Sequence, residues 1–265
     1  MFSSSEVTLT IPENHIGVLT VHRPHVLNAL SWEAMQAFGD AVEAARTADL
    51  RALVVTGGGR AFIAGGDLKQ LADYPTEADG RRMSRLMTRA LQNLEALPFP
   101  TIAAVNGPAR GGGSEVALAC DLRILAENAD LGFVQVAWFV TPGWGMGQRL
   151  LRLVGYSRAL EWLLTGKVLS PQEAQEHGLA NRVVPAGQAL EAALALAREI
   201  AALPPDVSQG IKSVLRAGVT LPPATAARLE HDVFPPLWAA REHVEAVLRF
   251  ARRASGNKSG EITAA

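Results

Sequence analysis

Two short apolar runs, each followed by a glycine-rich segment and then by a helical pattern, constrain the fold of this chain most strongly. The runs are Ala52–Val55 and Thr101–Val105, and both have the length and apolar content of buried strands. Ile16–Val21 and Leu122–Leu125 are predicted to be strands on the same grounds. Because strands alternate with helices in this part of the chain, the sequence predicts βαβ units, a mostly parallel sheet and the α/β class.

Helical patterns dominate after about residue 142, where only Asn181–Val184 looks like a strand. Helices are predicted from the spacing of apolar residues, with Ser31 as the N-cap of the first. They are expected at residues 34–45, 78–97, 113–120, 144–153, 157–165, 171–177, 187–202, 206–217 and 223–252, the last broken at Pro235–Pro236. We therefore expect a core over residues 1–200 and a helical C-terminal region over residues 201–265.

Composition argues against several classes of function. With 25 Lys+Arg and 26 Asp+Glu, the chain has no basic excess to neutralise a nucleic acid, so no nucleic-acid partner is expected. The one cysteine, Cys120, lies in an apolar run and is interpreted as a buried residue rather than a nucleophile. The six histidines lack metal-ligand spacing, so no metal site is expected. A polar N-terminus and the lack of a long apolar run predict a cytoplasmic protein with no membrane partner.

The glycine-rich segments are Gly57–Lys69 and Asn106–Glu115. Glycine lets a ligand approach the main chain closely, and a helix N-terminus leaves several N–H groups unpaired. Two such loops side by side can direct two N–H donors at one developing oxyanion. The alternative is that the glycines only form tight turns. Neither segment contains the dinucleotide-binding or phosphate-binding glycine pattern.

Four stretches resemble motifs of the crotonase, or enoyl-CoA hydratase/isomerase, superfamily, in the same order and at the same spacing. Residues 22–30 resemble N-R-P-x-x-x-N-A-L, 61–69 resemble A-F-x-A-G-x-D-[IL]-K, 106–115 resemble N-G-x-x-x-G-G-G-x-E, and 142–150 resemble P-G-x-G-G-x-Q-R-L. The resemblance extends from about Val7 to Phe250. It implies a crotonase-like spiral of ββα units with two near-perpendicular sheets. It also implies a helical C-terminal trimerisation region, and hence a homotrimer or a dimer of trimers.

The same resemblance implies an acyl-CoA substrate, with coenzyme A as part of that substrate and no separate cofactor. Gly66 and Gly112 would provide the two N–H groups of an oxyanion hole. The substrate and its coenzyme A moiety would contact the family's binding segments, namely Arg23, His25, Val26, Ala64, Asp67, Leu68, Lys69 and Pro142. Within this set, Arg23 and Lys69 are the candidate phosphate partners.

Hydratases of this family use two glutamates, and this chain matches only one of them. Glu115 corresponds to the first, and the position of the second, seven residues before Pro142, is occupied by Gln135. A glutamine amide does not exchange a proton near neutral pH, although it can orient water or a substrate oxygen. Addition of water by two carboxylates is therefore not the expected reaction.

Shorter stretches resemble ethylmalonyl-CoA decarboxylase: residues 133–135, 142–145, 204–207, 230–232 and 237–238. We therefore expect an acyl-CoA lyase that decarboxylates a short alkylmalonyl-CoA, because a malonyl-type thioester forms its enolate without a base. Protonated Glu115 would orient the substrate or protonate the enolate. The alternatives are an enoyl-CoA hydratase or isomerase that uses Glu115 alone, with Gln135 placing water, and a catalytically silent CoA-binding homologue.

Four further side chains have two interpretations each. Trp138, Trp144 and Trp238 are either walls of an acyl pocket or ordinary core residues, and Arg110 is either a partner of the substrate carboxylate or a surface residue.

Overall fold

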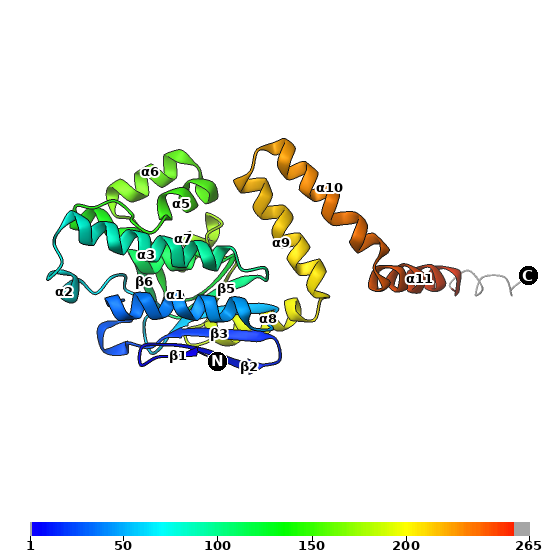
Figure 1. Cartoon of the computed structure of the whole chain (residues 1–265), viewed down its shortest axis with the longest axis horizontal. Coiled ribbons are helices and arrows are strands. Elements are labelled where there is room, and N and C mark those ends of the chain that lie inside the picture. Colours follow the sequence, from blue (N-terminus) through cyan, green and yellow to red (C-terminus); the bar gives the residue numbers. More distant parts are fainter. Residues whose placement is uncertain (1, 257–265) are drawn as a thin grey trace, which may run out of the picture. The chain divides into compact units, whose positions relative to one another are not determined.

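The computed structural model describes residues 2–256, and side chains up to residue 252 (Figure 1). The chain divides into two compact units, Met1–Ala202 and Leu203–Ala265. Residues 257–265 of the predicted C-terminal region lie outside the described residues. Every strand of the described chain belongs to the first unit.

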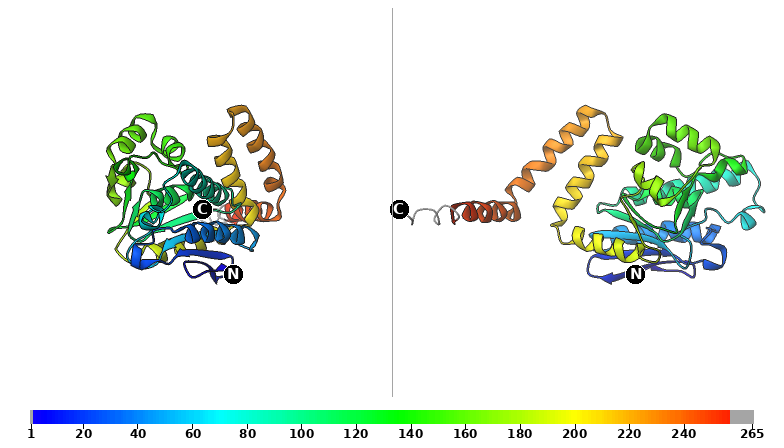
Figure 2. Two further views of the ribbon diagram at one scale, coloured as in Figure 1. Left: turned by 60° about the vertical axis from the view of Figure 1, so that its left-hand side comes forward. Right: turned by 180° about the vertical axis from the view of Figure 1, so that it is seen from behind.

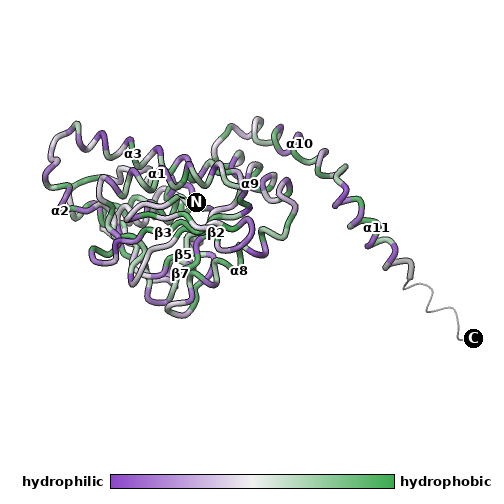
Figure 3. Tube along the Cα trace, turned by 60° about the horizontal axis from the view of Figure 1, so that its bottom comes forward, coloured by the Kyte–Doolittle hydropathy of each residue, from purple (hydrophilic) through white to green (hydrophobic). Residues whose placement is uncertain are grey.

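A seven-stranded sheet forms the centre of the first unit, in the order β1-β2-β3-β4-β5-β7-β10. Its strands are β1 (Phe2–Ser3), β2 (Val7–Glu13), β3 (Ile16–Val21), β4 (Ala52–Gly57), β5 (Thr101–Val105), β7 (Leu122–Ala126) and β10 (Arg182–Val184). β1, β2 and β3 pair antiparallel, and every later pair is parallel. The predicted α/β class and mostly parallel sheet are confirmed. Figure 3 shows the apolar character of β3, β5 and β7 as green stretches of the tube.

A second sheet of three strands has the order β6 (Pro108–Arg110), β8 (Asp130–Gly132) and β9 (Val168–Leu169). The chain leaves the large sheet after β5, adds β6 to the small sheet, and returns through a helix to β7. It then adds β8 to the small sheet, and after β9 it returns through another helix to β10. This repeated course is a spiral of ββα turns. The sequence analysis missed these three strands because two or three residues are too short to show a strand period.

Helices pack against the large sheet (Figure 2). Those of the first unit are α1 (Trp32–Thr47), α2 (Leu68–Leu71), α3 (Glu77–Glu95), α4 (Gly112–Ala119), α5 (Met146–Val154), α6 (Tyr156–Thr165), α7 (Pro171–Glu176) and α8 (Ala189–Ala201). Ser31 caps α1 as predicted, since its Oγ accepts a hydrogen bond of 3.0 Å from Ala34 N. α1 packs on β2, β3 and α3, whereas α8 packs on β4, β5 and β7.

The second unit contains α9 (Pro205–Thr220), α10 (Pro223–Ala239) and α11 (Arg241–Gly256). The predicted break at Pro235–Pro236 is wrong, because α10 continues through both prolines and the chain turns at Ala240. Val233 and Leu237, on either side of the prolines, pack against Gly210 of α9. This packing supports helical backbone where the prolines remove hydrogen bonds. The C-terminal helices are present as expected, and their role in trimerisation stays a prediction.

Cys120 is buried, as predicted. No helix within residues 2–256 has the length and apolar character needed to cross a bilayer. The same part of the chain contains no cluster of His, Cys, Asp and Glu side chains suited to a metal ion.

Candidate active site

A cavity of about 300 Å³ joins both glycine-rich segments to the region that follows β8. It is lined by Ala64, Gly65, Gly66, Leu68, Leu71, Gly80, Met83, Ser84, Gly111, Gly112, Glu115, Val134, Gln135, Trp138, Val140, Thr141, Gly143 and Trp144. Among these lining residues, only Glu115 has an ionisable side chain. The structure thus brings together all four residues predicted to be catalytic, Gly66, Gly112, Glu115 and Gln135.

The two glycine loops touch each other at this cavity. Gly65 has φ +98°, and a β-carbon placed on it would lie 3.3 Å from Gly112 N. The Gly65 carbonyl accepts a 2.7 Å hydrogen bond from Leu30 N, so the N–H of the same trans peptide, that of Gly66, points the opposite way. Gly112 is the first residue of α4, whose N–H has no partner within the helix. Within the described chain neither N–H donates to a backbone acceptor, so each remains able to donate to a ligand.

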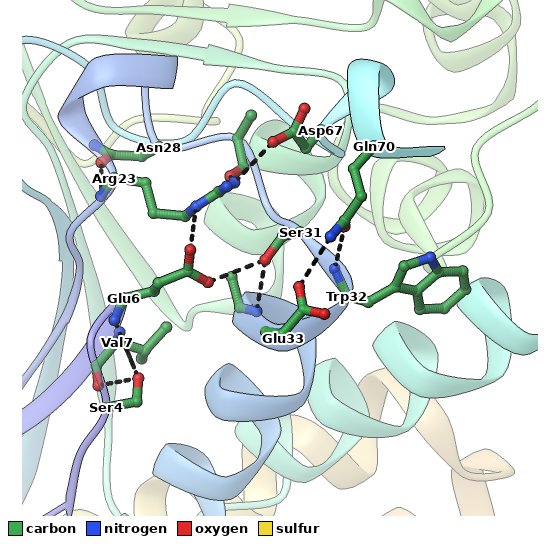
Figure 4. A network of polar contacts seen from close by, with 12 residues as sticks. Ser4, Glu6, Val7, Arg23, Asn28, Ser31, Trp32, Glu33, Asp67 and Gln70 are labelled. Atoms are coloured by element: carbon green, nitrogen blue, oxygen red, sulfur yellow. Dashed lines mark hydrogen bonds and ion pairs between the residues drawn. The ribbon is translucent and has the colours of Figure 1, made fainter. Parts of the chain in front are cut away.

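A buried polar network holds the Gly66 loop (Figure 4). Arg23 Nη1 donates to Asp67 Oδ2 at 3.1 Å, and Arg23 Nε lies 2.7 Å from Glu6 Oε1. The backbone N–H of Asp67, the residue after Gly66, donates to Leu30 O at 2.9 Å. Arg23 is 8% exposed and has two carboxylate partners within the protein. Arg23 therefore supports the loop, and its contact with a phosphate stays a prediction.

Trp144 packs directly against the Gly112 loop. A β-carbon on Gly112 would lie 2.1 Å from Trp144 Cζ3 and 2.4 Å from Trp144 Cη2. Only glycine therefore fits at position 112 beneath this ring. Trp144 is 4% exposed and lines the cavity, whereas Trp138 is exposed and lines it as well. Trp238 belongs to the second unit, where it contacts Phe234 and His243.

The carboxylate of Glu115 is enclosed by N–H donors. Its Oε2 accepts from Trp144 N at 2.8 Å and from Met146 N at 3.0 Å. Its Oε1 accepts longer bonds, 3.3 Å from Gln135 Nε2 and 3.4 Å from Gly143 N. Burial raises the pKa of the Glu115 carboxyl, and the hydrogen bonds from Met146, Trp144, Gln135 and Gly143 oppose that rise. Glu115 is thus both desolvated and fixed in position.

The amide of Gln135 is oriented by Glu115. Its Nε2 faces the carboxylate, and its Oε1 is buried without a hydrogen-bond partner in the described structure. An unpaired buried acceptor costs about 1–3 kcal/mol. The orientation of this amide is therefore coupled to the charge of Glu115.

Sequence reasoning missed the structural role of the buried Arg149, in the last of the four motifs. Its Nη1 donates to Trp144 O and its Nη2 to Glu95 Oε2, both at 2.7 Å. The one available signal was its place in the Gln148–Arg149 pair of that motif, and no acidic residue lies close in sequence to identify its partner.

The other predicted binding residues lie around the cavity in different ways. Ala64 and Leu68 line it, and Pro142 lies between two lining residues. His25 and Val26 belong to the short 3-10 helix Pro24–Val26, and Lys69 is exposed on α2. These three side chains are not part of the lining.

Arg110 is paired within the protein. Its Nη2 donates to Asp130 Oδ2 at 2.8 Å, across the pair β6 and β8. Arg110 is therefore occupied by a protein carboxylate in this structure.

Comparisons with known proteins agree with this architecture. The family model described as enoyl-CoA hydratase/isomerase matches residues 12–257. The short-chain-enoyl-CoA hydratase of Clostridium acetobutylicum is 32% identical over 91% of this chain and 93% of its own. The ethylmalonyl-CoA decarboxylase of Gallus gallus is 31% identical over 94% of this chain and 85% of its own.

A solved structure of an enoyl-CoA hydratase from Bacillus anthracis matches with a TM-score of 0.87 and 32% identity. The match covers 94% of this chain and 97% of that one. These findings confirm both the crotonase-type fold and the family resemblance read from the four motifs.

Proposed function

Because this chain belongs to the enoyl-CoA hydratase/isomerase family, we propose that it stabilises a thioester enolate between Gly66 N–H and Gly112 N–H. We further propose that this enolate arises by decarboxylation of a short alkylmalonyl-CoA. The likeness to the ethylmalonyl-CoA decarboxylase of Gallus gallus supports this reaction.

The observation that carries the proposal is the single ionisable side chain in the cavity lining. Hydration by two carboxylates needs a second acid, and position 135 offers an amide instead. In decarboxylation the bond between C2 and the carboxylate breaks, CO2 leaves, and the electron pair passes to the thioester oxygen. That step needs no base, and two N–H donors suffice to stabilise the product.

Glu115 then supplies the proton that C2 of the enolate must gain, and solvent later returns it. The shorter bonds at Oε2 leave Oε1 as the oxygen that carries this proton. Arrival of a substrate anion beside Glu115 raises its pKa further, which favours the protonated state. When Oε1 is protonated, the Gln135 amide turns so that its carbonyl accepts from Glu115, and its N–H then faces away from the carboxyl.

The second candidate function is hydration or isomerisation of an enoyl-CoA. Relatives named as hydratases support it, as do the N–H donors around Glu115, which favour a carboxylate able to act as a base. In this reaction Gln135 would orient the attacking water or a substrate oxygen.

A paired assay tests both candidates. We expect CO2 release from ethylmalonyl-CoA or methylmalonyl-CoA, with little loss of the conjugated-enoyl absorbance of crotonyl-CoA. Glu115→Gln should lower turnover by about 10²–10⁴-fold, the usual contribution of a general acid or base. Glu199→Gln, an exposed position on α8, is the matched control and should retain activity.

Rapid hydration without CO2 release would overturn decarboxylation in favour of the second candidate. Inertness toward all three thioesters would indicate the silent CoA-binding homologue. Full turnover by Glu115→Gln would overturn the role of Glu115.

A further inference from the structure

Exposure along the cavity wall distinguishes an open end from a closed end. Leu68, Trp138 and Val140 line the cavity and are exposed, so they mark its mouth. Glu115 and Trp144 line it and are buried, 2% and 4% exposed respectively, so they mark its closed end. A thioester oxygen bound by Gly112 N–H would place the start of the acyl group at the closed end.

The Trp144 indole occupies that end without taking part in the proposed chemistry. Its six-membered ring lies against Gly112, as the close approach of Cζ3 and Cη2 shows. An acyl group extending from a carbonyl beside Gly112 therefore meets this ring. The ring, rather than bulk solvent, limits the room available to the acyl carbons.

Three hydrogen bonds hold the backbone at Trp144, and the side chain is buried, so backbone and packing together keep the ring in place. Trp144 N donates to Glu115, and Trp144 O accepts from Arg149 Nη1 at 2.7 Å. The preceding carbonyl, Gly143 O, accepts from Ser84 Oγ at 2.7 Å. Movement of the backbone at Trp144 would break these hydrogen bonds, including the one from Arg149, which is buried and also pairs with Glu95. Leaving the buried Arg149 donor without an acceptor would destabilise the protein.

We propose that Trp144 is a specificity-determining residue that restricts this protein to thioesters of short acyl groups and excludes long straight-chain ones. The cavity volume of about 300 Å³ agrees with this, because it stands at the lower end for ligand pockets. The inference rests on the proposed acyl-CoA function, and it concerns which acyl group binds rather than which bond breaks.

Binding of saturated acyl-CoA thioesters tests the inference without any turnover. Isothermal titration with acetyl-, butyryl-, hexanoyl- and octanoyl-CoA gives the dissociation constant as a function of chain length. In the wild type we expect affinity to fall by about tenfold or more between butyryl and octanoyl, since one misfitting methylene costs about 10–200-fold. Trp144→Leu should remove most of that fall.

Two further variants make the result specific. Trp144→Phe should give a smaller change in the same direction, and it supplies the measurement if Trp144→Leu does not fold. Trp32→Leu removes a tryptophan of similar burial that does not line this cavity, and it should keep the wild-type profile.

The inference is overturned if the wild type binds octanoyl-CoA as tightly as butyryl-CoA, or if both Trp144 variants keep the wild-type profile. Failure of the proposed reaction is a separate result. It would appear as thioester binding with the expected chain-length profile but without CO2 release.

Discussion

Each of the two glycine loops is supported by one buried arginine, yet the two supports act differently. Arg23 holds the carboxylate of Asp67, the residue after Gly66, and is itself paired with Glu6 near the N-terminus. Arg149 instead holds the carbonyl of Trp144, whose ring covers Gly112. The Gly66 loop is therefore positioned by polar bonds, and the Gly112 loop by packing against an aromatic ring.

The two glycines also differ in the space that a side chain would find at each position. A β-carbon on Gly66 would lie 2.8 Å from Leu71 Cδ1, the end of a flexible side chain. A β-carbon on Gly112 would lie 2.1 Å from Cζ3 of Trp144, a buried side chain whose backbone is held by three hydrogen bonds. The first contact can relax by a rotamer change of Leu71, whereas the second is with a buried indole that has less room to turn.

The largest expected effect follows from this difference. Gly112→Ala should lower kcat/KM by about 10²–10³-fold, the loss seen when an oxyanion donor is displaced. The decrease in kcat/KM for Gly66→Ala should be smaller by a factor of about ten or more, because Leu71 can move aside. Steady-state kinetics of both variants, with thermal unfolding as a check on folding, makes the comparison.

The double variant Gly112→Ala/Trp144→Leu sharpens this prediction. If the clash causes the loss, the second substitution should recover part of the activity, giving a non-additive cycle. Equal losses for Gly66→Ala and Gly112→Ala, with no recovery in the double variant, would contradict the distinction between the loops.

Both arginines should matter for stability, and only one of them for selectivity. Arg23→Gln removes the arginine that pairs with Asp67 and Glu6, whereas Arg149→Gln leaves Glu95 with Arg152, 3.8 Å away. Breaking a buried pair typically costs about 3–5 kcal/mol of unfolding free energy, so we expect a loss approaching that range for Arg23→Gln and a smaller one for Arg149→Gln. Urea denaturation measures that loss. Only Arg149→Gln should also flatten the dependence of acyl-CoA affinity on chain length, because only Arg149 holds Trp144.

Glu6→Gln is the control for the Arg23 side. It should weaken the same network, and so its effect should largely disappear in the Arg23→Gln background. If Arg23→Gln changes the dependence of affinity on chain length, or if Arg149→Gln leaves it unchanged, the two arginines do not act separately on the two loops.

The smallest expected effect is the contribution of Glu115, which lies beside the Gly112 loop, to the pH dependence of the protein's unfolding free energy. Because burial raises the pKa of Glu115 above 4.5, the folded protein holds this proton more tightly than the unfolded chain does. The stabilisation is fully present below pH 4.5 and is lost as pH rises through the raised folded-state pKa. Its size is about 1.4 kcal/mol for each pH unit between the two pKa values.

Urea unfolding of the wild type and Glu115→Gln, from pH 4.5 to neutrality, measures this effect. The difference between their unfolding free energies should change in that window, whereas Glu199→Gln should follow the wild type throughout. A constant difference between wild type and Glu115→Gln would show that Glu115 titrates alike in the folded and unfolded chain.

Much of the fold was predictable because its signals are local. The apolar runs predicted to be buried strands form β3, β4, β5 and β7 in the structure. Ser31 caps its helix as expected. The strands β6, β8 and β9 were not predictable, since each depends on a partner distant in the chain. The continuation of α10 past Pro235 was not predictable either, because it depends on the packing of α10 against α9.

The sequence by itself determined the chemical parts of this protein: two glycine loops that follow buried strands, one glutamate after the glycine triplet, and an amide where a second acid would stand. Strand period, helix capping and glycine backbone freedom are properties of neighbouring residues, and so they can be read along the chain. Only the tertiary structure decided that Trp144 covers Gly112, that three backbone N–H groups surround Glu115, and that Arg149 meets Glu95. Those contacts join residues far apart in sequence, and they exist because the spiral brings the loop after β8 back against α3 and α4.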